Sequence, residues 1–191
     1  MIKKFIIIMM FPLLAFSAED EYLIDKSHFA VGFLVEHVGY AKTLGMFREI
    51  EGSYSHNLDT NKINNINISI KTGSVFTNHD KRDQHLMSPD FLNVEQYPEM
   101  LFKATDINIQ DDNTTIAGEL TLLGITKPLI LTGKINKVGK YPFGGLIKPY
   151  VMGISARGTI KRSEHGMNYA LKDNLVGDEI DLIIEFEARR Q

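Results

Sequence analysis

The sequence predicts an all-β fold, either an antiparallel sandwich or an up-and-down barrel of about eight strands. Apolar residues alternate with polar or small ones along almost every segment after the leader, and period two is the period of a strand. These segments are mostly joined by short turns rich in Gly, Asn, Asp and Pro. A barrel of eight strands is wide enough either to be filled by side chains or to hold one small ligand.

Residues 1–18 are typical of a cleavable export signal. Two lysines precede an apolar run, residues 5–16, that is too short to span a bilayer comfortably. Cleavage after Ser17 or Ala18 leaves one domain, residues 19–191, which we expect in the periplasm. The alternative is an uncleaved membrane anchor. The chain has no cysteine, which excludes disulfides and thiolate metal sites.

Alternation in the first half predicts an opening strand at residues 22–25, a turn at Lys26-Ser27 and a second strand at residues 29–36. Residues 44–56 are expected to form a long strand or a pair of strands. A bulge or bend is expected at Met46, Phe47 and Ile50, where apolar residues no longer fall on every second position. Residues 66–70 alternate cleanly and predict a half-buried strand.

Residues 77–91 interrupt the alternation with charged residues and two histidines. Thr77 and Asp80 have capping-box spacing, so a helix is predicted to begin here. Ser88-Pro89 ends it and can begin a second short helix. We interpret the segment as a helical flap across the β-structure. Arg82 either pins this flap by pairing with a carboxylate or faces an acidic ligand head group, and pinning is the simpler interpretation.

In the second half, strands are predicted at residues 100–105, 116–122, 129–135, 150–160 and 180–188, with a Gly- and Pro-rich loop at residues 139–149. Several of these strands carry small residues on their inward face. Such residues either leave room for a ligand or relieve crowding where the sheet curves. They are Ala104, Gly118, Ala156, Gly158 and Ala188.

Signatures of catalysis, metal binding and nucleic-acid binding are scarce. The net charge is −3 and no basic patch is evident, which argues against nucleic acid as a partner. The chain has no GxSxG elbow and no histidine pair with HExxH spacing. His79 and Asp83 are four residues apart, but a solvated helix face is the commoner reason for such spacing. We therefore expect neither an enzyme nor a metal site.

A set of short motifs extends over almost the whole mature chain. They are Tyr22-x-Ile24-Asp25 with His28, Val31-x-Phe33-x-Val35-x-His37, Gly45-x-Phe47 with Gly52, Ser74-Val75-x-Thr77, Arg82-Asp83-x-His85-Leu86-x-Ser88-x-Asp90-Phe91, Tyr97-Pro98-x-x-x-Phe102, Gly118-x-Leu120-Thr121-x-x-Gly124-x-Thr126-x-Pro128 and Arg162-Ser163-x-x-Gly166. Arg-Asp-x-His-Leu followed by Asp-Phe and Tyr-Pro is specific in combination. The pattern resembles the YceI-like, polyisoprenoid-binding family.

The resemblance implies an extended, lipocalin-like antiparallel barrel of eight strands in a periplasmic protein. Members hold a long-chain isoprenoid, of the polyprenyl or quinone type, or a similar fatty amphiphile in an apolar tunnel, and they have no established enzymatic mechanism. The expected partners are a long-chain lipid, a second copy of the chain and, transiently, a membrane. One departure is Phe29, where the family commonly has a small Ser. A bulkier residue there narrows or shortens the pocket, so ligand length stays open.

We expect inward-facing apolar residues of the strands, together with the flap, to line the tunnel and bind the lipid. They are Phe29, Val31, Phe33, Val35, Ile66, Ile68, Ile70, Leu86, Met87, Phe91, Met100, Phe102, Leu120, Leu122, Ile154, Ile160, Ile184 and Phe186. The polar residues expected to hold the flap or meet the head group are Arg82, Asp83, His85 and Arg162. Two alternatives remain: an enzyme or redox partner acting on an isoprenoid quinone through His85 with Asp83, and a filled barrel that serves as an interaction module.

Overall fold

The structure is a computed structural model that describes residues 19–105, 107–110 and 113–191. The predicted leader, residues 1–18, lies outside the described residues. The described elements are β1 (Glu19–His37), β2 (Ala41–Phe47), β3 (Ile50–Asn57), β4 (Lys62–Lys71), the 3₁₀ turn η1 (Thr72–Ser74), β5 (Val75–Phe76), α1 (Asp80–Met87), β6 (Glu99–Ala104), β7 (Ile107–Asn108), β8 (Thr114–Leu122), β9 (Ile125–Lys140), β10 (Tyr150–Lys161), the 3₁₀ turn η2 (Arg162–His165) and β11 (Val176–Arg190).

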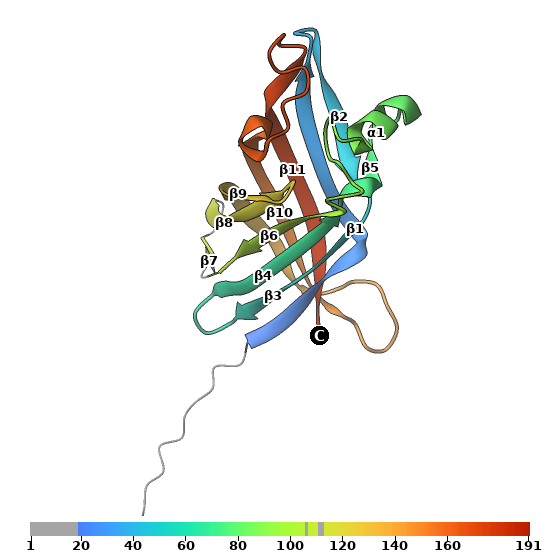
Figure 1. Ribbon diagram of the computed structural model, residues 1–191. Coiled ribbons are helices and arrows are strands. Elements are labelled where there is room, and N and C mark those ends of the chain that lie inside the picture. The colour runs from blue at the N-terminus through green and yellow to red at the C-terminus, as the bar shows by residue number, and fades with distance from the viewer. Residues whose placement is uncertain (1–18, 106, 111–112) are drawn as a thin grey trace, which may run out of the picture.

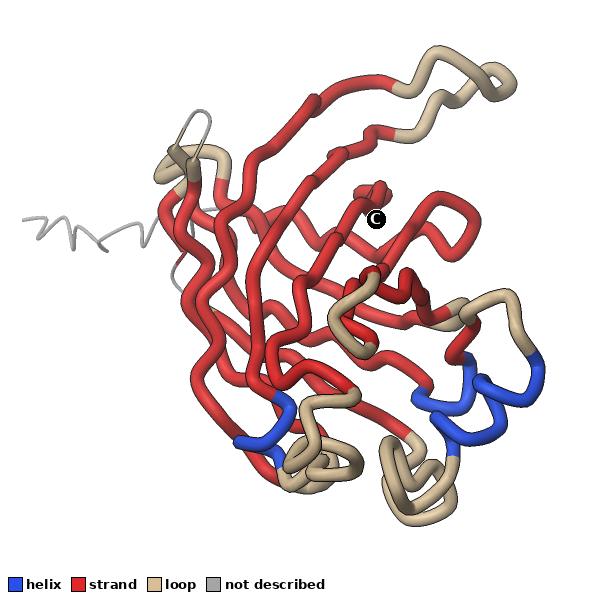
Figure 2. Tube along the Cα trace, turned by 90° about the horizontal axis from the view of Figure 1, so that it is seen from above, coloured by secondary structure: helices blue, strands red, loops and turns tan. Residues whose placement is uncertain are grey.

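Eight of these strands close into an antiparallel barrel, seen from the side in Figure 1 and from above in Figure 2. The order around the ring is β1, β3, β4, β6, β8, β9, β10 and β11, and β11 pairs back with β1. Closure leaves the ring without a free edge strand. The predicted all-β barrel is therefore confirmed, and the sandwich alternative is wrong.

Strand β1 pairs with two partners along one edge. Its first residues, from Glu19, pair with β3, and its last residues, to His37, pair with β2. Strands β2 and β3 thus act as one bent strand, broken at Arg48 and Glu49, whose backbone N–H groups both donate to the Ser74 hydroxyl at 3.1 Å. This break is the predicted bend within residues 44–56.

The predicted turn at Lys26-Ser27 is wrong, because β1 runs through it as a β-bulge. Its pairing with β11 shifts register between Ile24 and Phe29. The Asp25 carboxylate accepts a hydrogen bond from the Ser27 backbone N–H at 2.9 Å and holds the extra residues in place.

The flap is a single helix, α1, and its first residue differs from the prediction. His79, rather than Thr77, is the N-cap, and its Nδ1 accepts a hydrogen bond from the Arg82 backbone N–H at 3.2 Å. A turn, not a second helix, follows Ser88, and it is closed by the Phe91 N–H donating to the Ser88 carbonyl at 3.0 Å. Neither α1 nor any other described helix has the length and apolarity needed to cross a bilayer.

The end of the barrel near Glu19 and the C-terminus is filled with side chains. Tyr22 and Tyr54 stack there with ring centroids 5.3 Å apart, and Met152 and Ala188 are fully buried beside them. Burial raises the pKa of both tyrosine hydroxyls, which have no hydrogen-bond partner among the described residues. This packing gives the barrel a closed floor.

The inward glycines relieve crowding. A Cβ on Gly118 would lie 2.6 Å from Cζ of Phe102, and one on Gly158 would lie 2.6 Å from Cδ2 of Leu131. Each glycine therefore lets the neighbouring strand's large side chain lie flat against the sheet. The space that the glycine leaves is occupied, so the cavity described below has another origin.

Candidate functional site

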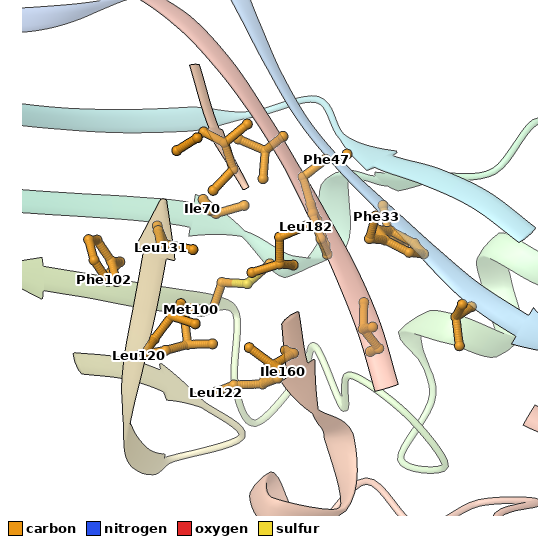
Figure 3. Close-up of a pocket in the computed structure, with 18 of the residues that line it drawn as sticks. Phe33, Phe47, Ile70, Met100, Phe102, Leu120, Leu122, Leu131, Ile160 and Leu182 are labelled. Carbon is orange, nitrogen blue, oxygen red and sulfur yellow. The ribbon is translucent and has the colours of Figure 1, made fainter. Parts of the chain in front are cut away.

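A cavity of ≈ 620 Å³ occupies the barrel above the closed floor (Figure 3). Binding sites for small molecules have volumes of about 300–1,000 Å³, so this one is large enough for a ligand. Its lining comes from both sides of the ring, and Figure 3 shows side chains such as Phe33, Leu182 and Met100 turned toward the same space. The barrel is therefore not filled throughout its length.

Sixteen of the eighteen apolar residues expected in the tunnel line this cavity. The two that do not are Phe29 and Met87. Phe29 stands where the β1 bulge ends and lines a separate hollow of ≈ 530 Å³ beneath the loop of residues 141–149. Met87, at the last position of α1, packs against the core cluster. Of the four polar residues, Arg82, His85 and Arg162 reach the cavity, while Asp83 does not.

Several lining residues were missed although the alternation contained their signal. Leu129 and Leu131 are buried and face inward, while Ile130 between them is 65% exposed. Leu182 likewise lies between two inward residues of β11. The alternation does not indicate the direction of Phe47, because the break at residues 48–49 shifts the inward positions of β2 relative to those of β3. The missed apolar lining residues include Ile24, Phe47, Ile50, Tyr54, Ile63, Val75, Leu129, Leu131, Met167, Tyr169, Leu175, Val176, Ile180 and Leu182.

Some side chains that point into the barrel are only partly buried, and their exposed surface marks the unfilled part of the cavity. Ile160, Leu182 and Ile184 point into the barrel, yet each keeps intermediate exposure. The surface that they keep faces the cavity. A hydrocarbon chain placed there would remove this apolar surface from water, at about 25 cal/mol per Å².

The cavity opens at the end of the barrel opposite the closed floor. Apart from Lys134 on β9, its exposed lining residues come from the turn after β1, from α1 with its N-cap, and from the loop of residues 166–175. These segments lie together at the upper end in Figure 1, away from the C-terminus. The exposed residues of this mouth are Glu36, His37, Val38, His79, Lys81, Arg82, Tyr169 and Leu175.

Hydrogen bonds tie α1 to the segment after β5. The Arg82 guanidinium donates to the hydroxyl and to the carbonyl oxygen of Thr77, each at 2.7 Å. The buried Asp83 carboxylate accepts from the Thr77 backbone N–H at 2.9 Å and also from the Thr77 hydroxyl. Both side chains thus hold the helix at one side of the mouth.

Three aromatic rings bridge α1 and the opposite loop. His85 packs edge-to-face on Phe91 and on Tyr169, with centroids 5.0 Å and 4.9 Å apart. His85 Nε2 lies 2.8 Å from an Asp90 carboxylate oxygen. In this structure His85 is paired with Asp90, and Asp83 with Thr77, so the two residues named in the quinone-enzyme alternative have separate partners.

Arg162 organises the other side of the mouth. This side chain is 1% exposed, and its guanidinium donates to the carbonyl oxygens of Gly177, Met167 and Val176 at 2.7–2.8 Å. Burial lowers the pKa of the guanidinium, an effect that nearby Asp178 opposes. Arg162 therefore holds the loop between η2 and β11, and each of its three guanidinium nitrogens donates to a backbone carbonyl.

One polar cluster of the described chain has the composition of a metal site, but it is organised as an ion-pair network. Asp25, His28 and Glu187 bring ligand atoms within 4.8 Å of one another on the barrel exterior. The same Asp25 oxygen lies 2.9 Å from His28 Nδ1 and 2.6 Å from an Arg189 guanidinium nitrogen. An arginine at this distance competes directly with a cation. His79 and Asp83, the other candidate pair, have the separate partners described above.

The Asp25 carboxyl is the clearest pH-sensitive group of the fold. Desolvation by burial acts to raise its pKa, but hydrogen bonds from His28, Ser27 and Arg189 outweigh it and lower the pKa to about 2. Because the folded-state pKa lies below the unfolded one, the ionised group stabilises the protein above about pH 4. That stabilisation is lost as the pH falls toward 2.

We predict that Asp25→Asn lowers the free energy of unfolding at pH 7 by on the order of 2 kcal/mol. The variant should also lose less stability than the parent between pH 7 and pH 3, by about 1 kcal/mol, because it lacks the titrating group. Urea unfolding at the two pH values measures both effects. An identical decrease in both proteins would contradict the assignment.

Comparison with known proteins identifies the family of this barrel. A model of the YceI-like domain matches residues 22–188. Protein YceI of Escherichia coli O17:K52:H18 is 36% identical over 195 residues, with 99% of each chain covered. A UPF0312 protein of Photorhabdus laumondii is 35% identical over 177 residues, which cover 93% of this chain and 89% of that one.

Solved structures share the fold. BcnA of Burkholderia cenocepacia superposes with a TM-score of 0.72 at 14% identity, covering 86% of this chain and 98% of that one. A Campylobacter jejuni YCEI protein gives 0.69 at 27% identity, covering 82% and 90%. A polyisoprenoid binding domain from Saccharophagus degradans gives 0.66 at 10% identity, covering 91% and 100%. The family match over most of the sequence, together with this shared barrel, shows that the chain belongs to the YceI-like family.

Proposed function

We propose that this protein is a periplasmic carrier that holds one long-chain amphiphile, an isoprenoid of the polyprenyl or quinone type or a similar lipid, in the barrel cavity. The observation that carries the proposal is a cavity of ≈ 620 Å³ lined almost entirely by apolar side chains and opening at one end. A hydrocarbon chain needs no hydrogen bonds, and each buried CH₂ contributes about 0.8 kcal/mol. Burial alone can therefore supply the affinity.

The periplasmic part of the proposal is supported by the sequence of residues 1–18, in which two lysines precede a short apolar run. The isoprenoid part is supported by family membership and by the name of the Saccharophagus degradans neighbour, a polyisoprenoid binding domain. In the proposed complex the tail occupies the cavity as far as the floor at Tyr54. The polar end stays at the mouth, close to Lys81, Arg82 and His85.

The proposal is tested by purifying the protein gently from its own cells, recording native mass spectra, and extracting the bound material with organic solvent. We expect close to one long-chain lipid per protein chain, and its identity names the cargo. Cell fractionation of the same culture locates the protein. A protein that arrives empty and also rejects added polyprenols and quinones would refute the carrier function.

A further inference from the structure

The loop of residues 141–149, between β9 and β10, exposes large apolar side chains to solvent. Phe143 is 74% exposed, Leu146 107% and Ile147 91%. The base of the loop is closed by the Tyr141 N–H, which donates to the Pro149 carbonyl at 2.8 Å. Figure 1 shows the loop standing away from the barrel near the C-terminus. It therefore presents an aromatic and aliphatic tip on a defined base.

The two strands that carry this loop contain basic residues but no acidic ones. Residues 120–163 contain no aspartate or glutamate, although the net charge of the chain is −3. The net charge does not reveal this segregation, because acidic residues elsewhere in the chain offset the basic ones. The basic residues of the segment are Lys127, Lys134, Lys137, Lys140, Lys148, Arg157, Lys161 and Arg162.

The lysines nearest the tip are available to a partner. Arg157 pairs with Glu185, and Arg162 is buried against carbonyl groups, so neither serves the surface. Lys137, Lys140 and Lys148 are exposed, and none of them forms an ion pair within the described residues. Lys148 donates only to the Pro142 carbonyl, at 3.2 Å. An apolar tip with unpaired cations around its base matches the chemistry of an anionic membrane interface.

We propose that the loop of residues 141–149 docks the protein on an anionic lipid bilayer. Phe143, Leu146 and Ile147 enter the region between head groups and acyl chains, while Lys140 and Lys148 lie at the level of the lipid phosphates. A second copy of the chain fits the loop less well. In a two-fold symmetric contact it would bring the same unpaired lysines of both copies together.

Strand register gives the orientation of the docked protein. Tyr150, at the base of the loop, pairs with Lys140, and the adjacent Val151 pairs with Arg189 beside the closed floor. Lys161, at the other end of β10, pairs with Glu179, close to the mouth. Docking by the loop therefore places the mouth on the side of the barrel away from the bilayer. This goes beyond the carrier function, since attachment by the loop requires no cargo.

The chain contains no tryptophan, so a single one reports on the loop without background. The probes are vesicles of phosphatidylcholine alone and vesicles containing 30% phosphatidylglycerol. We expect the Leu146→Trp fluorescence to shift to the blue on the anionic vesicles and to be quenched by lipids brominated on their acyl chains. The matched Ile130→Trp variant, at an exposed position on the outer face of β9, should show neither effect.

Vesicle sedimentation of the unlabelled protein measures the contribution of each group. We expect at least tenfold stronger partitioning to anionic vesicles than to neutral ones. Phe143→Ser/Leu146→Ser/Ile147→Ser should lower it at least tenfold, whereas Tyr40→Ser/Ile130→Ser, which removes exposed apolar side chains elsewhere, should leave it unchanged. Lys137→Gln/Lys140→Gln/Lys148→Gln should abolish the preference for anionic lipid.

Unchanged partitioning of the triple serine variant, or no binding of the parent protein to anionic vesicles, would overturn the proposal. A dimer in analytical ultracentrifugation that the serine variant abolishes, without vesicle binding, would assign the loop to a second copy instead. The bound lipid per chain should be equal in the parent and the serine variant, because the loop does not line the cavity. Failure of docking is thereby separated from failure of the carrier function.

Discussion

Ile184→Asp is expected to empty the barrel while leaving it folded. Ile184 lies on β11, faces the cavity and keeps intermediate exposure, so a carboxylate there can remain partly hydrated in the empty protein. In the loaded protein the same carboxylate would face hydrocarbon without a hydrogen-bond partner, which costs several kcal/mol. Since about 1.4 kcal/mol corresponds to a tenfold change, lipid affinity should fall by at least tenfold. Native mass spectrometry of lipid per chain measures the loss.

The neighbouring residue supplies a matched control. Ile183 also has intermediate exposure, but it lies on the outer face of the same strand, paired with Gly32 and Arg157, and it does not line the cavity. Ile183→Asp introduces the same charge at almost the same place and should retain full loading. If both variants stay folded and both keep the lipid, the ligand does not occupy this part of the barrel.

Arg162→Ala is expected to cause the largest loss of stability. The substitution leaves three carbonyl oxygens, of Gly177, Met167 and Val176, without their donor inside the protein. A buried polar group left unpaired costs about 1–3 kcal/mol, and we expect a total loss of about 3–5 kcal/mol in the free energy of unfolding. Urea unfolding followed by circular dichroism measures it.

Two further variants separate geometry from charge at this position. Lys161→Ala, at the exposed neighbouring residue, should change stability by less than about 0.5 kcal/mol. Arg162→Lys keeps the charge, but its single ammonium cannot reproduce the planar fork that reaches three carbonyls, so it should recover only part of the loss. Full stability in Arg162→Lys would show that charge alone matters there.

The strands could be predicted from the sequence because the alternation of apolar and polar residues is a local feature of each strand. Alternation along residues 29–36, 116–122 and 180–188 depends only on which residues share a face, and the structure confirms β-strands at all three. The predicted turn at Lys26-Ser27 failed for the same reason. A bulge also breaks period two, and only the partner strand, here β11, determines whether the chain turns back or continues.

For the flap, too, the local sequence predicted the helix, but a tertiary contact determined where the helix begins. Charge and capping spacing correctly indicated a helix in residues 77–91. Asp83 determines the first residue of that helix. Its carboxylate accepts hydrogen bonds from both the backbone N–H and the hydroxyl of Thr77, so Thr77 does not act as the N-cap. The competing partner lies six residues away in sequence, and the sequence alone does not rank the two arrangements.

By itself the sequence determined the fold class, the inward faces of most strands and the place of the flap. Each of these depends on periodicity, turn residues or family motifs, which are local features of the sequence. Only the tertiary structure decided whether the barrel is filled or hollow. Large inward side chains such as Phe102 and Leu131 lie flat over glycines of neighbouring strands, Tyr22 and Tyr54 fill one end, and the rest of the interior stays open. Volume depends on how side chains from strands distant in sequence interlock, and no local pattern contains that information.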